Sequence, residues 1–166
     1  MSESGREVDG PAAQLRVVAP GLYTLLVDAG RPGSRALGVP VGGAADRAAL
    51  LLGNALVGNP PETPALEVAL SGPTLQTDAS VACVLCGADF QLAAEGHPRG
   101  SLQSNKTFTL AAGGTLNIGA ARSGARGYLC IRGGFQAPLI LGSRSALEPL
   151  SAGITLNCRA ATIGRR

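Results

Sequence analysis

A glycine-rich loop that leads into an apolar helix is the feature of this sequence with the clearest chemical potential. The loop covers residues 38–43, ends in Gly42 and Gly43, and is followed by Asp46 and the helical pattern 46–57. Glycine lets backbone approach a ligand closely, and a helix N-terminus presents free N–H groups and a positive dipole end. The arrangement suits an anionic or carbonyl-bearing ligand. Such loops are also ordinary turns, so both interpretations stay open.

A second polar pair follows an apolar run directly. Asp28 and Arg31 lie in the turn 28–33, immediately after the predicted strand 23–27. One interpretation is a turn in which the carboxylate pairs with the guanidinium. The other is a binding role, because the planar donor fork of arginine can hold a carboxylate or orient a reacting carbonyl.

Three polar residues stand in or beside apolar elements. Asp46 is placed to cap the helix, which would be enough to explain it. Asn54 shares a helix face with Arg47, so its amide is either exposed or braces the Gly42-Gly43 loop. Glu67 lies in the apolar run 65–70 and needs a partner only if it points inward.

Near the end of the sequence, the turn 141–145 contains Arg144 and Ser145. A glycine turn with an arginine and two hydroxyls is either an anion-binding nest or an ordinary turn. No complete catalytic triad is evident.

The cysteines and the single histidine do not indicate a metal site. Cys83 and Cys86 lie three residues apart in an apolar run, and in a strand such residues project to opposite faces. Buried free thiols are therefore predicted for all four cysteines. His97 is assigned to solvent, and no metal is expected in this chain.

Composition limits the function class. The 166 residues suit one domain, 45% of them are apolar, and only 3% are aromatic. The net charge of +3 is scattered rather than gathered into a basic stripe with aromatics, which argues against nucleic-acid binding. No apolar run approaches the ~20 residues that span a bilayer, and no signal segment is evident, so we expect no membrane partner and a cytoplasmic location.

Short apolar runs separated by turn residues predict a mainly β fold, a closed or nearly closed barrel with one or two short helices. Residues 1–14 are expected to be a flexible tail and residues 15–166 a single domain. The clearest predicted hairpin joins 108–110 to 115–118 across 111–114. The predicted strands are 15–18, 23–27, 65–70, 74–77, 81–85, 90–92, 107–110, 115–118 and 128–131.

Several blocks in order carry a resemblance to a known family. They are Ala19-Pro20-Gly21-Leu22-Tyr23-Thr24, Asp28-Ala29-Gly30-Arg31-Pro32-Gly33, Gly38-Val39-Pro40-Val41-Gly42-Gly43-Ala44-Ala45-Asp46, Asn54-Ala55-Leu56-Val57-Gly58-Asn59, Ala65-Leu66-Glu67, Ser71-Gly72-Pro73, Gly87-Ala88-Asp89, Tyr128-Leu129, Gly133-Gly134-Phe135 and Leu141-Gly142-Ser143-Arg144-Ser145. Together they resemble the second subunit of the biotin-dependent carboxyltransferase, or allophanate-hydrolase-subunit-2, family. That family includes the third subunit of bacterial 5-oxoprolinase and part of the carboxyltransferase region of urea carboxylase.

The resemblance implies a cyclophilin-like β-barrel, usually the first of two similar halves, that works with a companion subunit of related fold. It implies ATP-dependent opening of 5-oxoproline to L-glutamate in a multi-subunit complex, or carboxyl transfer from carboxybiotin to urea or a related amide. ATP is then expected at the level of the complex. Because the sequence after Ser145 departs from the family pattern, a non-catalytic or regulatory partner-binding module is a further alternative.

The resemblance also implies roles for residues that match its blocks. Asp28, Arg31, Asp46 and Asn54 are expected to be catalytic, binding or polarising an amide or lactam carbonyl. The expected substrate-binding residues are Gly42, Gly43, Glu67, Arg144 and Ser145. The sequence departs from the usual pattern at Val27, Ala45 and Gly53, where the family commonly has Gln, Met and Ala.

Overall fold

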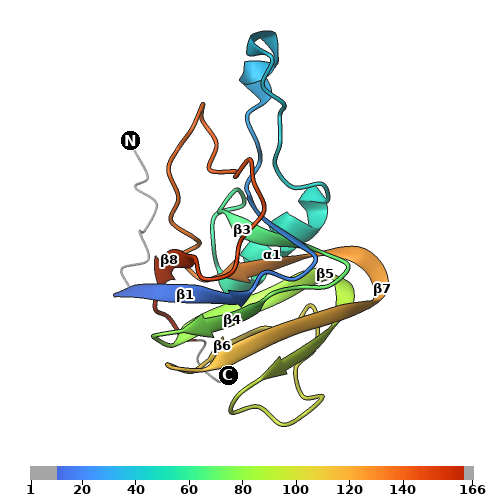
Figure 1. Ribbon diagram of the computed structural model, residues 1–166, viewed down its shortest axis with the longest axis vertical. Helices are drawn as coiled ribbons and strands as arrows, with labels where there is room; N and C mark the ends of the chain where they lie inside the picture. Colours follow the sequence, from blue (N-terminus) through green and yellow to red (C-terminus); the bar gives the residue numbers. More distant parts are fainter. Residues whose placement is uncertain (1–10, 163–166) are drawn as a thin grey trace.

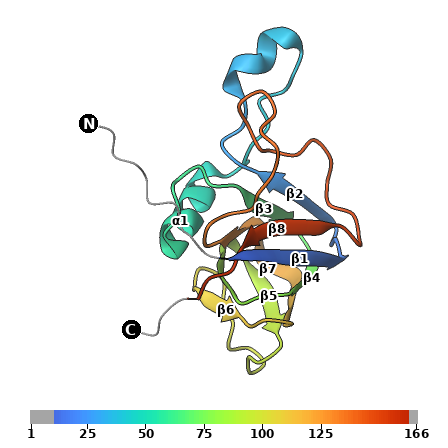
Figure 2. The same ribbon diagram turned by 90° about the vertical axis from the view of Figure 1, so that its left-hand side faces the viewer.

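The computed structural model describes residues 11–162, which form a strongly curled antiparallel sheet with one α-helix and one 3-10 helix (Figures 1 and 2). The mainly β, barrel-type fold that the sequence predicts is confirmed. The helices are η1 (Pro32–Leu37) and α1 (Arg47–Val57). The strands are β1 (Ala12–Ala19), β2 (Tyr23–Val27), β3 (Ala65–Ala69), β4 (Thr74–Thr77), β5 (Val81–Ala94), β6 (Phe108–Leu110), β7 (Thr115–Ile131) and β8 (Thr155–Arg159).

The long strand β7 curls the sheet. Its first residues pair with β4 and its last residues with β3, while β5 follows it along most of its length. The resulting strand order is β2-β3-β7-β4-β1-β8, with β5 beside β7 and β6 beside β5. Register shifts between residues 87 and 92 of β5 let these two strands bend together. The sheet is therefore a half-barrel. Within residues 11–162, the two outer strands of this order, β2 and β8, have no further strand on their far side.

The connection between β7 and β8 covers those two outer strands. The N–H of Ala146 donates to the carbonyl of Leu26 in β2 (2.8 Å), and the N–H of Gln136 donates to the carbonyl of Asn157 in β8 (2.8 Å). In Figure 2 this connection and the segment that contains η1, between β2 and α1, project together from one end of the barrel. The edge strands are thereby protected, and the connection lies beside the Asp28–Arg31 turn.

Mainly aliphatic side chains, with a few aromatic rings, form the core on both faces of the sheet. One buried cluster fills the concave interior, with Leu15, Leu75 and Phe90 among its members. The other lies between α1 and the outer face and includes Leu50, Tyr128 and Cys130. A Cβ at Gly53 would lie 2.6 Å from the sulfur of Cys130, so α1 packs closely only because residue 53 is glycine.

The predicted helix is confirmed, with both of its ends. Asp46 is its N-cap and accepts a hydrogen bond from the N–H of Ala49 (3.0 Å). Gly58 ends it in the left-handed conformation, which glycine adopts without strain. Within residues 11–162 no helix is long and apolar enough to cross a membrane.

Burial of the thiols is also confirmed. Cys83 belongs to the inner cluster and Cys86 to the one under α1, as alternation in a strand requires. All four cysteines are free and buried, and desolvation raises the pKa of Cys130 and of Cys158 to about 12.

The predicted hairpin between 108–110 and 115–118 is wrong, although its alternating buried side chains are confirmed. β6 pairs with β5 instead, and β7 pairs with β4. The turn itself explains this, because the N–H of Gly113 donates to the carbonyl of Thr77 (2.9 Å) and the N–H of Thr77 to the carbonyl of Gly114 (3.1 Å). These bonds direct the chain onto the end of β4.

Two other expectations need correction. β1 begins at Ala12, so residues 12–14 belong to a strand rather than to the expected tail, of which residues 1–10 lie outside the described part. His97 is half-buried rather than solvated. Its Nε2 lies 2.9 Å from the carbonyl oxygen of Thr109, and its ring meets Phe108 edge-on.

Candidate functional site

The glycine loop is folded against the Asp28–Arg31 turn through its backbone. The N–H of Arg31 donates to the carbonyl of Val41 (2.7 Å), and the N–H of Ala44 donates to the carbonyl of Asp28 (3.0 Å). A Cβ at Gly43 would lie 2.7 Å from the nitrogen of Gly30. Gly43 therefore permits a close approach between two backbone segments. Gly42 is exposed, and a Cβ added there would have one neighbour, Nη1 of Arg31 at 3.7 Å.

A buried carboxylate and a buried phenol hold the end of this loop in front of α1. Glu67 and Tyr128 lie directly opposite each other on β3 and β7. The hydroxyl of Tyr128 donates to Glu67 (2.8 Å) and accepts from the N–H of Asp46 (2.7 Å). The N–H of Ala45 donates to the same carboxylate oxygen of Glu67 (2.9 Å). Burial is the main reason that the pKa of Tyr128 is raised, so the phenol stays protonated as a donor.

This network changes the interpretation of the helix N-terminus. Three N–H groups around the start of α1 are already bound within the protein: that of Ala45 to Glu67, that of Asp46 to Tyr128 and that of Ala49 to the carboxylate of Asp46. The carboxylate of Glu67, only 5% exposed, places a negative charge beside the loop that leads into α1. Its other oxygen accepts from Nε of Arg126 (3.2 Å), whose side chain is half-exposed.

Asp28 clamps the 143–145 turn to the body of the protein. Its carboxylate accepts hydrogen bonds from the hydroxyls of Ser143 (2.6 Å) and Ser145 (2.7 Å) and from the N–H groups of Arg144 (2.6 Å) and Gly30 (2.7 Å). Burial alone would raise the pKa of Asp28, but these four donors outweigh it and lower the pKa below its ordinary value. The carboxylate is consequently held ionised and fully engaged.

Arg31 acts on the same segment, and it makes no ion pair with Asp28 within residues 11–162. Its guanidinium is 3% exposed and donates to the carbonyls of Ser145 (Nη2, 2.6 Å) and Ile140 (Nε, 3.3 Å). The turn that contains Arg144 and Ser145 is thus held by two buried side chains, the carboxylate of Asp28 and the guanidinium of Arg31. The side chain of Arg144 is exposed and donates to the carbonyl of Ala137.

Asn54 braces a different loop from the one expected. Its amide is 0% exposed and donates to the carbonyls of Pro61 (3.1 Å) and Thr63 (2.9 Å), while its oxygen accepts from the amide of Asn59 (3.1 Å). Asn59 continues the chain of bonds to the carbonyl of Ile131 (2.7 Å). The expectation that Asn54 braces Gly42 and Gly43 is wrong, because the amide faces the turn after α1.

The expected site residues therefore fall into three groups. Asp28, Arg31, Arg144 and Ser145 meet at the 143–145 turn, whereas Asp46 and Glu67 meet at the start of α1. Asn54 lies apart from both. Sequence reasoning missed Tyr128 and Arg126. The last strand-like run, 128–131, contains Tyr128 and could have signalled it, whereas Arg126 lies before that run and is brought to Glu67 only by the pairing of β3 with β7.

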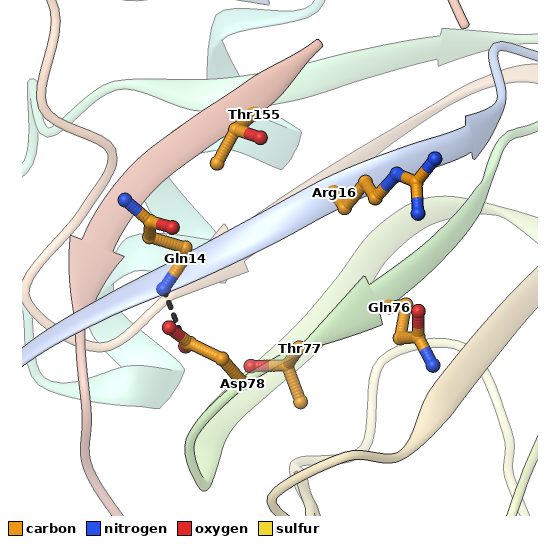
Figure 3. Close-up of a pocket in the computed structure, with 6 residues that line it drawn as sticks. All are labelled: Gln14, Arg16, Gln76, Thr77, Asp78 and Thr155. Atoms are coloured by element: carbon orange, nitrogen blue, oxygen red, sulfur yellow. Dashed lines mark hydrogen bonds between the residues drawn. The ribbon is translucent and has the colours of Figure 1, made fainter. Parts of the chain in front are cut away.

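A separate polar groove of about 280 Å³ lies on the outer face of β1, β4 and β8. Figure 3 shows its side chains projecting from these strands, with the N–H of Gln14 bonded to Asp78. It shares no lining residue with the networks above. The lining residues are Gln14, Arg16, Gln76, Thr77, Asp78 and Thr155.

No group of three or more His, Cys, Asp or Glu side chains in the described part of the chain is placed to hold a metal ion. The polar groups at both networks are carboxylates, hydroxyls, guanidinium groups and backbone amides. Such groups can bind and orient a polar carbonyl compound through hydrogen bonds.

The chain is similar in sequence to two kinds of known protein, 5-oxoprolinase C subunits and urea amidolyases. The chain is 36% identical over 132 residues to the C subunit of 5-oxoprolinase from Haemophilus influenzae, covering 79% of this chain and 42% of that protein. It is 36% identical over 132 residues to urea amidolyase of Saccharomyces cerevisiae, covering 79% of this chain and 7% of that protein. The chain thus spans less than half the length of each of these relatives.

Solved structures with a similar fold include a relative of the same kind. A crystal structure of TTHA0988 superposes with a TM-score of 0.80 at 31% identity, covering 96% of this chain and 34% of that one. The Kluyveromyces lactis urea amidolyase superposes with a TM-score of 0.79 at 32% identity, covering 86% of this chain and 9% of that one. A family model described as carboxyltransferase domain, subdomain A and B, matches residues 37–160, so the chain belongs to the carboxyltransferase-domain family.

Proposed function

We propose that this chain is part of a 5-oxoprolinase-like complex that opens the lactam ring of 5-oxoproline to L-glutamate at the expense of ATP. The observation that carries the proposal is the likeness to the 5-oxoprolinase C subunits of two organisms, at 36% and 33% identity. The chain would work in the cytoplasm beside a companion subunit of related fold.

In this proposal the lactam binds at the start of α1, beside the Gly42-Gly43 loop. Asp46 is the acid of this region with an exposed side chain, and one of its oxygens caps the helix. We assign Asp46 the contact with the lactam amide, because a carboxylate can accept a hydrogen bond from the amide N–H. Glu67 and Tyr128 are positioning residues that fix the loop. Asp28, Arg31, Arg144 and Ser145 hold the neighbouring turn, and Asn54 holds the turn after α1.

Within residues 11–162, the start of α1 is a poor fit for the phosphates of ATP. A phosphate cradle needs free, convergent N–H groups. At the start of α1 the N–H groups of Ala45, Asp46 and Ala49 are bound internally, and the carboxylates of Glu67 and Asp46 would repel a polyanion. We therefore place ATP on a companion subunit and assign this chain the amide substrate.

The test is reconstitution of the full chain with its companion subunits, followed by measurement of ATP-dependent glutamate formation from 5-oxoproline. Asp46→Asn keeps a good helix cap and removes the negative charge. We expect it to lower kcat/KM about 10- to 100-fold, the range for one lost charge-assisted hydrogen bond to the substrate. Asp89→Asn, which changes a half-exposed acid paired with Arg122 at 3.9 Å, is the matched control. Companion binding without turnover would favour a non-catalytic module.

The urea amidolyase relatives favour a second candidate, carboxyl transfer to urea or a related amide. Carboxybiotin would then arrive on a carrier protein as a substrate, and the chain needs no resident site for it. Carboxylation of urea that depends on a biotinylated carrier, with no glutamate formed from 5-oxoproline, would establish this candidate over the first.

A further inference from the structure

Arg126 differs from the other paired arginines in the described part of the chain. Three ion pairs occur there, and in two of them both side chains are well exposed: Arg47 with Glu62 at 4.0 Å and Arg122 with Asp89 at 3.9 Å. Arg126 instead binds Glu67, whose side chain is only 6% exposed, at 3.2 Å. A buried partner gives this arginine a defined position.

The pairing uses only one edge of the guanidinium. Nε donates to Oε1 of Glu67, and neither Nη atom has a hydrogen-bond partner among residues 11–162. The Arg126 side chain remains 48% exposed. Glu67 thus anchors the guanidinium at its inner end and leaves the two outer nitrogens open to solvent.

The anchor also fixes where those nitrogens lie. Oε2 of Glu67 accepts from the N–H of Ala45 and from Tyr128, which in turn accepts from the N–H of Asp46. The guanidinium and the loop before α1 are therefore attached to one carboxylate. A ligand held by Asp46 would therefore lie beside the network that positions Arg126.

We propose that Arg126 is a substrate-binding residue that recognises the carboxylate of the substrate through its two outer nitrogens, while Glu67 holds it in place. This inference rests on the proposed function, since 5-oxoproline carries a carboxylate and urea does not. The planar donor fork of arginine matches a carboxylate in two-point contact. Arg126 would accordingly select a lactam acid over a neutral amide.

The experiment compares 5-oxoproline with 2-pyrrolidone, the same lactam without the carboxylate. Binding of each to the full chain is measured by calorimetry, and KM and kcat are measured in the reconstituted complex. Arg126→Gln should weaken binding of 5-oxoproline and raise its KM about 10- to 100-fold, the range for a lost charge-assisted contact, with a smaller effect on kcat. Binding of 2-pyrrolidone should not change. Arg126→Lys, which keeps the charge but not the fork, should fall between.

Arg122→Gln is the matched control, because Arg122 is an exposed arginine of the same strand with an exposed partner. It should leave both ligands unaffected. Equal effects of Arg126→Gln on the two lactams, or no effect on either, would show that Arg126 merely neutralises Glu67. If the wild-type complex forms no glutamate, the proposed function fails. The calorimetric comparison still decides the role of Arg126, and a wild-type chain without preference for the lactam acid overturns it.

Discussion

The hydroxyl of Tyr128 donates to the carboxylate of Glu67 across 2.8 Å, between directly opposed positions of β7 and β3. Through this pair, two strands of the sheet determine where the loop before α1 ends, because the N–H groups of Ala45 and Asp46 bind the same two side chains. A helix N-terminus that resembles an anion site in sequence is thus capped from within, and the position of the loop depends on the sheet.

Replacement of Tyr128 by phenylalanine should loosen that loop. The change removes a donor to Glu67 and the acceptor for the N–H of Asp46, in a place with no exposure to water. We expect a loss of about 1–3 kcal/mol in the free energy of unfolding. Amide hydrogen exchange at Asp46 should also be faster. Tyr23→Phe, at a 43% exposed position, should change neither quantity.

Asp28→Asn should release the 143–145 turn. The amide group would face donors where the carboxylate now accepts from Ser143, Ser145 and the N–H of Arg144. We expect about 2–4 kcal/mol of destabilisation in urea unfolding, consistent with breaking a buried network. Asp89→Asn is again the exposed control.

The free energy of unfolding should fall at acid pH, in part because Asp28 becomes protonated. Its pKa in the folded protein lies below the ordinary value of 3.8, so the unfolded chain binds the proton more readily. The contribution of Asp28 is therefore complete above that value and is lost as the pH falls through the folded pKa. Urea unfolding between pH 6 and about pH 2 should show this loss in the wild type and a weaker one in Asp28→Asn. An unchanged acid slope in the variant would contradict the assignment.

The two loop glycines should differ sharply when changed to alanine. At Gly43 the new Cβ would lie 2.7 Å from the nitrogen of Gly30 and 2.9 Å from the carbonyl oxygen of Asp28, at φ +82°. Backbone atoms cannot yield cheaply, so we expect a loss above about 3 kcal/mol. Gly42→Ala, at φ +62° with one ordinary contact, should cost only the about 1–2 kcal/mol of a left-handed residue. Thermal unfolding of both variants measures the difference.

Asn54→Asp should be damaging for structural reasons. An aspartate cannot donate to the carbonyls of Pro61 and Thr63, and it would place a carboxylate against them without exposure to water. We expect a loss of about 3 kcal/mol or more. Asn117→Asp, whose amide bonds Thr74 at an exposed position, should stay within about 0.5 kcal/mol of wild type. Equal stabilities of the two variants in urea would show that the Asn54 network is dispensable.

Local patterns in the sequence determined the parts of the structure that depend on near neighbours. The run 46–57 with Asp46 before it and Gly58 after it defines α1, because caps and apolar periodicity act within a few residues. Alternation in 81–86 placed Cys83 and Cys86 on opposite faces for the same reason. The barrel-type fold followed from the number of short apolar runs.

Only the tertiary structure decided which partners the polar residues have. Tyr128 meets Glu67 across 61 residues of sequence, and Asp28 meets Ser143 across 115. The sequence marked Asp28 and Arg31 as a polar pair on a turn, and Asn54 and Glu67 as polar groups in apolar elements. It could not distinguish an internal clamp from a ligand site, since periodicity is a local property whereas strand pairing joins distant segments. The pairing of β3 with β7, and not any motif, gave Glu67 its phenol and Arg126 its fixed position.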